Sequence, residues 1–132
     1  MENLIVLQKR RENFAYLKSK LECVQDKLLL PQATANSNPS WFGFLMVCKD
    51  GVSRNDLVLA LEKAQIQTRA LFAGNIIKHP FFDSIRESDA YRVVGELTNT
   101  DKIMNNAFWV GVYPGMSNAM LDRIAKVIIE NL

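Results

Sequence analysis

The chain has 132 residues, of which 48% are hydrophobic and 23% charged, and its formal net charge is +2 at pH 7. A chain of this length suits one domain that buries about two thirds of the surface exposed by the unfolded chain. The composition excludes collagen, long disordered tails and disulfide-rich scaffolds. Only two cysteines, Cys23 and Cys48, are present, so a reducing cytoplasm is the expected compartment.

Neither the charge nor the hydropathy indicates a nucleic-acid or membrane partner. The 16 basic residues nearly balance the 14 acidic ones, and the single basic run, Lys9–Arg11, is typical of a solvated helix face. The longest apolar run, Trp41–Cys48, is far shorter than the roughly 20 residues of a membrane helix. The N-terminus places its basic cluster after a short apolar stretch, unlike a signal peptide. We therefore expect a cytoplasmic protein without a nucleic-acid or membrane partner.

The first predicted element is a long helix over residues 3–28. Its apolar residues recur three, four or seven positions apart on one stripe, namely Leu7, Phe14, Leu17, Leu21, Val24 and Leu28. Cys23 is placed on the same side. A helix of that length extends about 39 Å, so we expect it to overhang a small domain and connect to another body. Pro31 ends the pattern, which divides the chain into a linking helix, 1–30, and an α+β domain, 31–132.

The next elements are a strand and a capped helix. Residues 32–40 are polar and turn-rich, and a buried strand is predicted over Trp41–Val47. Ser53 followed by Asp56 resembles a capping box. The helix that it opens should bury one apolar face, made of Leu57, Ala60, Leu61 and Ala64.

The second half of the chain predicts two more strands and two more helices. A strand is expected over Ile66–Phe72, followed by an irregular stretch, 78–96, that contains Pro80. Thr98 or Asn99 would cap a short helix through Asn105, before a strand over Phe108–Val112. Ser117 would cap a last helix whose inward residues are Met120, Leu121, Ile124, Val127 and Ile128. Three or four strands packed on helices make an α+β fold.

The sequence contains none of the common catalytic signatures. Glycine-rich nucleotide loops, HExxH and GxSxG are all missing. His79 lies in the irregular stretch, where histidine is more often solvated than catalytic, although histidine is suited to acid–base work. Two cysteines without a second pair do not make a metal site. The residues alone therefore predict no catalytic and no metal-binding side chain.

Two segments are unusual for a scaffold. Residues 68–75 (TRALFAGN) place the guanidinium of Arg69 and the amide of Asn75 at opposite ends of a strand and its turn. Arginine suits planar or phosphorylated anions because its donors are forked; the alternative is an Arg69 paired with a surface carboxylate. Residues 108–115 (FWVGVYPG) are by themselves typical of a core strand and turn.

Four segments, in order, resemble the DegT/DnrJ/EryC1/StrS aminotransferase family. They are 39–44 (PSWFGF), 68–75 (TRALFAGN), 91–101 (YRVVGELTNTD) and 108–115 (FWVGVYPG). The resemblance covers nearly the whole chain and is strongest to the branch of nucleotide-sugar 3-dehydrases. It implies the small C-terminal domain of a fold-type I PLP-dependent transferase, with three or four mainly antiparallel strands packed on helices after a long connecting helix. Ala70 and Met116-Ser117 depart conservatively from the family pattern.

For a whole enzyme, the resemblance implies 3-dehydration of a CDP-4-keto-6-deoxyhexose, a step toward 3,6-dideoxyhexoses of the lipopolysaccharide O antigen. It implies pyridoxamine or pyridoxal phosphate as electron sink, a 2Fe–2S cluster, an NADH-dependent iron–sulfur flavin reductase as partner, and a homodimer. The cofactor site, the catalytic histidine and the cluster cysteines are expected in a larger N-terminal domain. This fragment is therefore expected to be inactive alone and to bind none of these cofactors.

The resemblance also assigns site residues. The positions expected to face the cleft that holds the nucleotide sugar are Arg69, Phe72, Gly74 and Asn75. Of these, Arg69 and Asn75 are the expected polar contacts, and Gly74 allows close backbone approach. Phe42 and its neighbour Trp41 are expected at the edge of the cofactor, and Phe42 stands where aminotransferase relatives tend to have histidine.

Several alternatives stay open at this point. Phe42 and Phe72 can be ordinary core aromatics. The parent protein can be a PLP-dependent nucleotide-sugar aminotransferase, against which Phe42 argues. The chain can also be a non-catalytic structural or dimerisation module.

Overall fold

The computed structural model describes the backbone of residues 2–132 and the side chains of residues 4–132. Its α-helices are α1 (Glu2–Leu21), α2 (Arg54–Lys63), α3 (Thr98–Asn106) and α4 (Asn118–Glu130). Its strands are β1 (Leu28–Leu29), β2 (Gly43–Cys48), β3 (Thr68–Ala70) and β4 (Ala107–Gly111). Short 3-10 helices occupy Glu22–Val24, Ile76–Lys78 and Pro80–Phe82.

The four strands form one antiparallel sheet in the order β1-β2-β4-β3. In the central row, Leu45 of β2 and Arg69 of β3 both lie opposite Trp109 of β4. The predicted α+β fold with three or four mainly antiparallel strands is confirmed. The order also brings β2 and β3 to either side of β4, which is the last strand in sequence.

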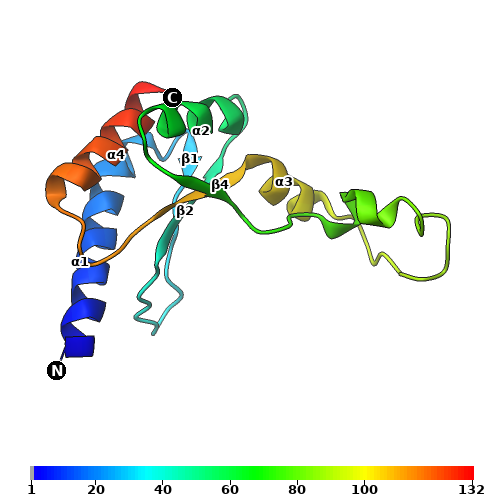
Figure 1. The fold of residues 1–132 in the computed structure, drawn as a ribbon, viewed down its shortest axis with the longest axis horizontal. Coiled ribbons are helices and arrows are strands. Elements are labelled where there is room, and N and C mark those ends of the chain that lie inside the picture. Colours follow the sequence, from blue (N-terminus) through cyan, green and yellow to red (C-terminus); the bar gives the residue numbers. More distant parts are fainter. Residues whose placement is uncertain (1) are drawn as a thin grey trace.

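Helices cover one face of the sheet only. Along β2 the side chains of Phe44, Met46 and Cys48 are fully buried, whereas the residues between them are half-buried. The buried face packs against α1, α2 and α4 (Figure 1) in a core whose helical members include Leu17, Leu21, Leu57, Leu61, Leu121 and Ile128. Burial raises the pKa of the Cys48 thiol. The other face has no helix layer of this kind.

A buried amide fastens α1 to the turn between β4 and α4. Asn13 is 1% exposed, and its Nδ2 donates to the carbonyl of Tyr113 (2.8 Å) and lies 3.4 Å from that of Met116. Tyr16, one turn further along α1, donates to Asp122 of α4 (3.0 Å). The long helix is therefore docked on the domain rather than free of it.

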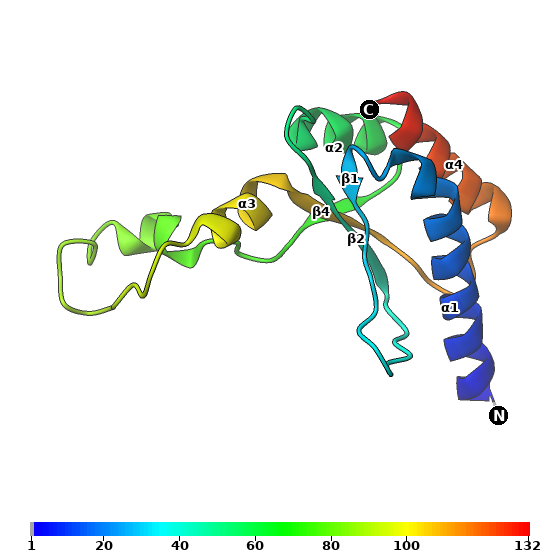
Figure 2. The same cartoon turned by 180° about the vertical axis from the view of Figure 1, so that it is seen from behind.

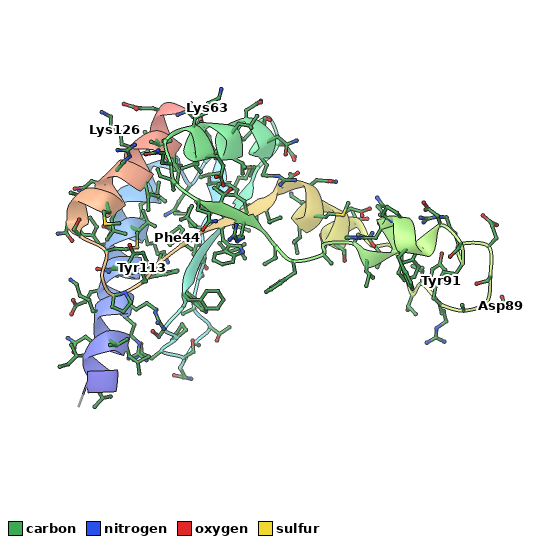
Figure 3. All side chains as sticks on the ribbon, viewed as in Figure 1. Phe44, Lys63, Asp89, Tyr91, Tyr113 and Lys126 are labelled. Atoms are coloured by element: carbon green, nitrogen blue, oxygen red, sulfur yellow. The ribbon has the colours of Figure 1, made fainter. Side chains whose placement is uncertain are left out.

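Residues 71–97 form an arm that projects from the body, on the side away from α1 and α4, as Figures 1 and 2 both show. No residue from 76 to 106 is buried. Near the tip, where Figure 3 labels Tyr91 and Asp89, the Tyr91 ring meets Phe82 edge-on at 5.1 Å. The arm keeps its shape by local contacts of this kind and by the Arg86–Asp83 ion pair (2.7 Å).

The predicted helix over residues 3–28 is wrong at its C-terminal end. The α-helix ends at Leu21, a 3-10 turn follows, and Leu28 and Leu29 join the sheet instead. The cause is a distant segment: the N–H of Lys49 donates to the carbonyl of Lys27 (2.9 Å), which draws the chain into a strand beside β2. Cys23, predicted on the core side, is exposed because the 3-10 turn rotates it outward.

The other predicted strand bounds differ by one or two residues. The strands predicted over Trp41–Val47, Ile66–Phe72 and Phe108–Val112 are Gly43–Cys48, Thr68–Ala70 and Ala107–Gly111. The caps predicted at Ser53 and Ser117 are confirmed, since each side chain accepts from a backbone N–H.

Two further details of the helices are wrong. Neither Thr98 nor Asn99 caps α3, because Leu97 holds the N-cap position without a side-chain bond. Met120, predicted inward, is 43% exposed.

Candidate functional site

The face of the sheet without helices carries an aromatic surface. The strand register puts Leu45, Trp109 and Arg69 in one row across β2, β4 and β3. The side chains of a strand alternate between its two faces, and the neighbours of Leu45 and Trp109 in sequence, Phe44 and Phe108, are fully buried on the helix side. The row therefore faces away from the core.

Phe42, the residue before β2, adds a second aromatic ring to this surface. Its ring meets that of Trp109 edge-to-face, with centroids 5.5 Å apart and planes at 82°, a geometry that aromatic pairs favour. Gly43 makes the arrangement possible, because a Cβ at that position would lie 2.5 Å from Cε3 of Trp109. The indole of Trp109 thus occupies the space that a side chain at position 43 would fill.

Beside these rings lies an apolar pocket of about 140 Å³, here called the aromatic cup. The cup is lined by Trp41, Phe42, Gly43, Leu45, Leu71, Phe72 and Trp109. The cup unites two segments that are far apart in sequence, the start of β2 and the turn after β3. Phe42 and Phe72, predicted as parts of different subsites, line the same pocket.

Trp41 and Phe42 pack on different aromatic rings. The Trp41 ring packs on Phe14 of α1 with centroids 5.0 Å apart, and Phe14 packs in turn on Phe44 of the core. Phe42 is 64% exposed. The two residues predicted together at the cofactor edge therefore differ in burial: Trp41 is half-buried, packing on the core while also lining the cup, and Phe42 is a surface residue.

Phe72 is held in a strained and exposed conformation. Its φ is 47°, in the left-handed region that non-glycine residues seldom adopt, and its side chain is 86% exposed. Gly74, two residues on, also has a positive φ of 63°, and any Cβ there would collide with Met104 of α3. The close approach predicted for Gly74 is thus made within the chain, to α3.

Asn75 is buried rather than presented to a ligand. It is 2% exposed, and its Nδ2 donates to Oδ1 of Asp101 at 2.6 Å, while Nζ of Lys78 binds Oδ2 at 2.8 Å. These bonds, from Lys78 and then from Asn75, lower the pKa of the Asp101 carboxyl. Asn75 therefore fastens the turn after β3 to α3, and through that turn it fixes Phe72.

Arg69 is exposed and forms no ion pair with any residue that the structure describes. Its Nη1 donates weakly to the carbonyl of Thr68 (3.4 Å). With its amide turned so that Oε1 faces the guanidinium, Gln67 accepts from Nη1 and Nη2 at 3.1 and 3.0 Å. The predicted alternative, a salt bridge to a surface carboxylate, is not formed at contact distance, but the charge of Arg69 contributes, after the hydrogen bonds from Thr68, to lowering the pKa of the nearby Glu62 carboxyl.

Three participants were missed in the sequence. Trp109 was interpreted as core, and neither Asp101 nor Asn13 was singled out. A tryptophan two residues before Gly111 in a short strand was the only signal for the first. The other two act through partners about 26 and 100 residues away in sequence, which no local pattern reveals.

The described residues offer no metal site and no membrane-spanning helix. Among residues 4–132 no group of three or more His, Cys, Asp or Glu side chains is placed to hold a metal ion. A 2Fe–2S cluster takes four protein ligands, usually thiolates, whereas this chain has an exposed Cys23 and a buried Cys48; these residues do not fit that cluster. No helix in the same part of the chain has the length and apolar character that crossing a bilayer requires.

Comparison with known proteins agrees with the arrangement of these segments. The sequence profile of the DegT/DnrJ/EryC1/StrS aminotransferase family matches residues 4–129. This chain belongs to that family. It is 50% identical over 94% of its length to the lipopolysaccharide biosynthesis protein RfbH of Salmonella typhimurium, and 45% identical over 92% to the dTDP-4-dehydro-2,6-dideoxy-D-glucose 3-dehydratase of Saccharopolyspora spinosa.

Solved structures show the same fold. A GDP-4-keto-6-deoxymannose-3-dehydratase with a trapped PLP-glutamate geminal diamine superposes with a TM-score of 0.78 over 94% of this chain at 28% identity. An aminotransferase of the family from Brucella abortus gives 0.75 at 17% identity, a likeness of fold alone. The chain spans 28% and 26% of the two curated relatives and 31% of both structures. It therefore corresponds to about a quarter to a third of proteins of this kind.

Proposed function

We propose that this chain is the C-terminal domain of a pyridoxamine-phosphate-dependent nucleotide-sugar 3-dehydratase that makes 3,6-dideoxyhexoses for lipopolysaccharide. The observation that carries the proposal is the identity of 45–50% to RfbH and to a 3-dehydratase over more than nine tenths of the chain. The aminotransferases of known structure are only 15–20% identical. The presence of Phe42 where aminotransferase relatives tend to have histidine points the same way.

Within such an enzyme, the chain would supply one wall of the substrate cleft. The uncovered face of the sheet, with Phe42 and Trp109, and the turn that carries Phe72 form that wall. Arg69, which is exposed and has no contact ion pair among the described residues, could offer its guanidinium to a phosphate. Asn75 contributes by positioning, since its amide is already bound to Asp101.

The whole enzyme's cofactors and partners follow from the family resemblance. Pyridoxamine phosphate supplies an electron sink when it is bound, and we place it, together with the 2Fe–2S cluster, on the remainder of the polypeptide. The cup lacks the carboxylate that pairs with a pyridinium nitrogen in such sites, which supports that assignment. We further propose CDP-4-keto-6-deoxyhexose as substrate, an NADH-dependent iron–sulfur flavin reductase as partner, a homodimer, and the bacterial cytoplasm as location.

We also propose different roles for the two parts of the chain. Residues 1–30, of which residue 1 lies outside the described part, would link to the larger domain, and residues 31–132 would form the small domain. The exposed apolar side chains of Leu4 and Ile5 near the start of α1, 70% and 67% exposed, support a link to another body at that end.

A graft tests the proposed function. The region of the Saccharopolyspora spinosa 3-dehydratase that matches this chain is replaced by the chain, and 3-dehydration of that enzyme's nucleotide sugar is measured. We expect the graft to retain dehydration, whereas the same graft made from the Brucella abortus aminotransferase should not. A graft that melts like its parent and binds the cofactor, yet dehydrates no substrate, would refute the proposal. The isolated chain should show neither turnover nor saturable binding of pyridoxal phosphate by absorbance.

A further inference from the structure

Two side-chain polar atoms in the described part of the chain are buried without a hydrogen-bond partner. They are Nε of Arg10, on α1, and Oγ of Ser40, in the loop before β2. Nearly all buried polar groups in folded proteins find a partner, and a group that does not costs free energy. The two atoms therefore mark a place where the described residues do not complete the hydrogen bonding.

Both atoms belong to the junction between α1 and the loop before β2. Arg11 ties the two together, since its Nη2 donates to the carbonyl of Asn38 at 2.7 Å and its Nε to that of Pro39 at 3.3 Å. Arg10 precedes Arg11 in α1, and Ser40 follows Pro39 in the loop. The free donor and the free hydroxyl are thus carried by the neighbours of residues that are already in contact.

Arg10 faces this junction because of its position on the helix. Residues four apart lie on the same face of an α-helix, so Arg10 shares the face of Phe14. The Phe14 ring packs on Trp41, with centroids 5.0 Å apart, and Trp41 follows Ser40 in sequence. The half-buried side chain of Arg10 therefore lies on the loop side of α1 and not in open solvent.

The charge of Arg10 is not balanced among the described residues. None of the ion pairs found there includes it, whereas its neighbour Lys9 pairs with Glu12 at 3.5 Å. Arg11 is bound to neutral carbonyls. The basic run predicted to be a solvated helix face thus contains a half-buried guanidinium without an anionic partner. A carboxylate is the side-chain group whose two oxygens match the forked donors of arginine.

The surface around Arg10 has the composition of an interface. Leu4, Ile5 and Val6 are 70%, 67% and 43% exposed. Val6 lies one helical turn before Arg10, on the same face. Protein interfaces combine apolar side chains with arginine, and desolvated arginines are often their anchors. The start of α1 and the loop before β2 extend beyond the sheet on the same side of the body (Figures 1 and 2), so one partner can contact both.

We propose that the guanidinium of Arg10 and the hydroxyl of Ser40 bind a carboxylate side chain of the larger domain, and that this contact docks the start of α1 on that domain. The existence of the larger domain rests on the proposed function. The chain spans only 28% and 26% of its two curated relatives, and α1 is its proposed link to the rest. The positive charge selects an acidic partner surface, and the same contact covers the exposed apolar residues of α1.

Arg10→Lys turns the proposed ion pair into one that can be trapped. In the graft of this chain into the Saccharopolyspora spinosa 3-dehydratase, a carbodiimide joins a lysine amine to a carboxylate in contact with it, and mass spectrometry locates the amide. We expect a new amide between residue 10 and an aspartate or glutamate of the large domain of the same polypeptide. The graft that keeps Arg10 gives the background from Lys9. No new amide, or one to a carboxylate within this chain or on a second subunit, would overturn the proposal.

The effect of removing the charge should depend on the presence of the larger domain. Arg10→Met keeps a long unbranched side chain and deletes the unpartnered donor, so the isolated chain should melt no lower than its parent. In the graft the same change leaves the carboxylate unpaired, and the melting temperature should fall by about 3 °C. Arg11→Met is the matched control, because its acceptors lie within the chain, and it should lower both melting temperatures. An Arg10→Met change that lowers both proteins equally, or neither, contradicts the docking role.

A small anion is the competing occupant, and sodium phosphate tests for it. We expect phosphate to change the melting temperatures of the isolated chain and of its Arg10→Met variant equally. A rise in the parent alone would assign the site to a free anion and overturn the docking role.

The outcomes also separate this inference from the proposed function. A graft that dehydrates its substrate, while Arg10→Met has the same effect in the graft and in the isolated chain, overturns the docking contact alone. A folded, cofactor-bound graft that forms the amide at residue 10 but dehydrates no substrate refutes the dehydratase and leaves the docking contact standing.

Discussion

Replacing Asn13 by alanine should destabilise the fold by about 2 kcal/mol. The side chain is 1% exposed, and its Nδ2 makes one short bond, 2.8 Å to the Tyr113 carbonyl, with the carbonyls of Met116 and Pro114 at 3.4 and 3.5 Å. Alanine deletes the donor and leaves the Tyr113 carbonyl without its partner inside the protein, which costs about 1–3 kcal/mol. At about 4 °C per kcal/mol for a domain of this size, the melting temperature should fall by about 8 °C.

Aspartate at the same position sharpens the test. It has nearly the shape of asparagine but presents oxygens to three carbonyl oxygens in a buried site, so Asn13→Asp should be more destabilising than Asn13→Ala. Urea unfolding followed by circular dichroism gives the free energies, with an unchanged m value as the check on two-state behaviour. Gln8→Ala, which removes an exposed hydrogen bond to Glu12, serves as the control and should stay within about 0.5 kcal/mol of the parent. An Asn13→Ala variant as stable as that control, or an aspartate variant more stable than alanine, would refute the donor argument.

Three further predictions concern the cup, the turn and a cap. Gly43→Ala should displace the Trp109 indole, cost about 1–3 kcal/mol and alter the tryptophan fluorescence, because a Cβ there meets Trp109 Cε3 at 2.5 Å; an unchanged spectrum contradicts the packing. Lys78 and Asn75 hold the pKa of Asp101 below its ordinary value of 3.8, so the bonds it makes stabilise the turn fully above pH 3.8 and are lost as the pH falls below that value through the lowered pKa. The Asn75 side-chain amide signals should report this loss, and Asp101→Asn should abolish its pH dependence. Ser117→Ala should cost about 1 kcal/mol in urea unfolding because Oγ of Ser117 accepts from the first turn of α4, and Ser117→Asp should restore it.

Much of the fold was predictable because it depends on local pattern. The caps of α2 and α4 were read from Ser53 and Ser117, whose side chains bond residues three positions away. The strands β2 and β4 were predicted from short runs of aromatic and branched residues, and their predicted ends differed from the structure by one or two residues because hydrogen bonding to a partner decides where pairing stops. The family was recognisable from four short segments in a fixed order.

The site was predictable as a set of segments but not as a geometry. Residues 68–75 and the start of β2 were both singled out, yet sequence placed Trp41 beside Phe42 in one subsite. In the structure, the ring of Trp41 packs on Phe14, whereas that of Phe42 packs on Trp109, and the regular alternation of a strand does not predict this, because both residues precede β2. Asn75 was expected to contact a ligand, whereas its amide is bound to Asp101. That partner lies on a helix formed later in the chain, and only the folded arrangement brings the two together.

The sequence by itself determined the fold class, the capped helices, the buried strands and the family, because periodicity, caps and motifs are properties of neighbouring residues. Tertiary structure alone decided that α1 ends at Leu21. The carbonyl of Lys27 accepts a hydrogen bond from the N–H of Lys49, the residue after β2 and about twenty positions further along the chain, so the segment joins the sheet instead of the helix. It also decided that Asn13 is buried and that one face of the sheet is left with an aromatic cup. These features depend on contacts between distant segments, whose register no local signal specifies.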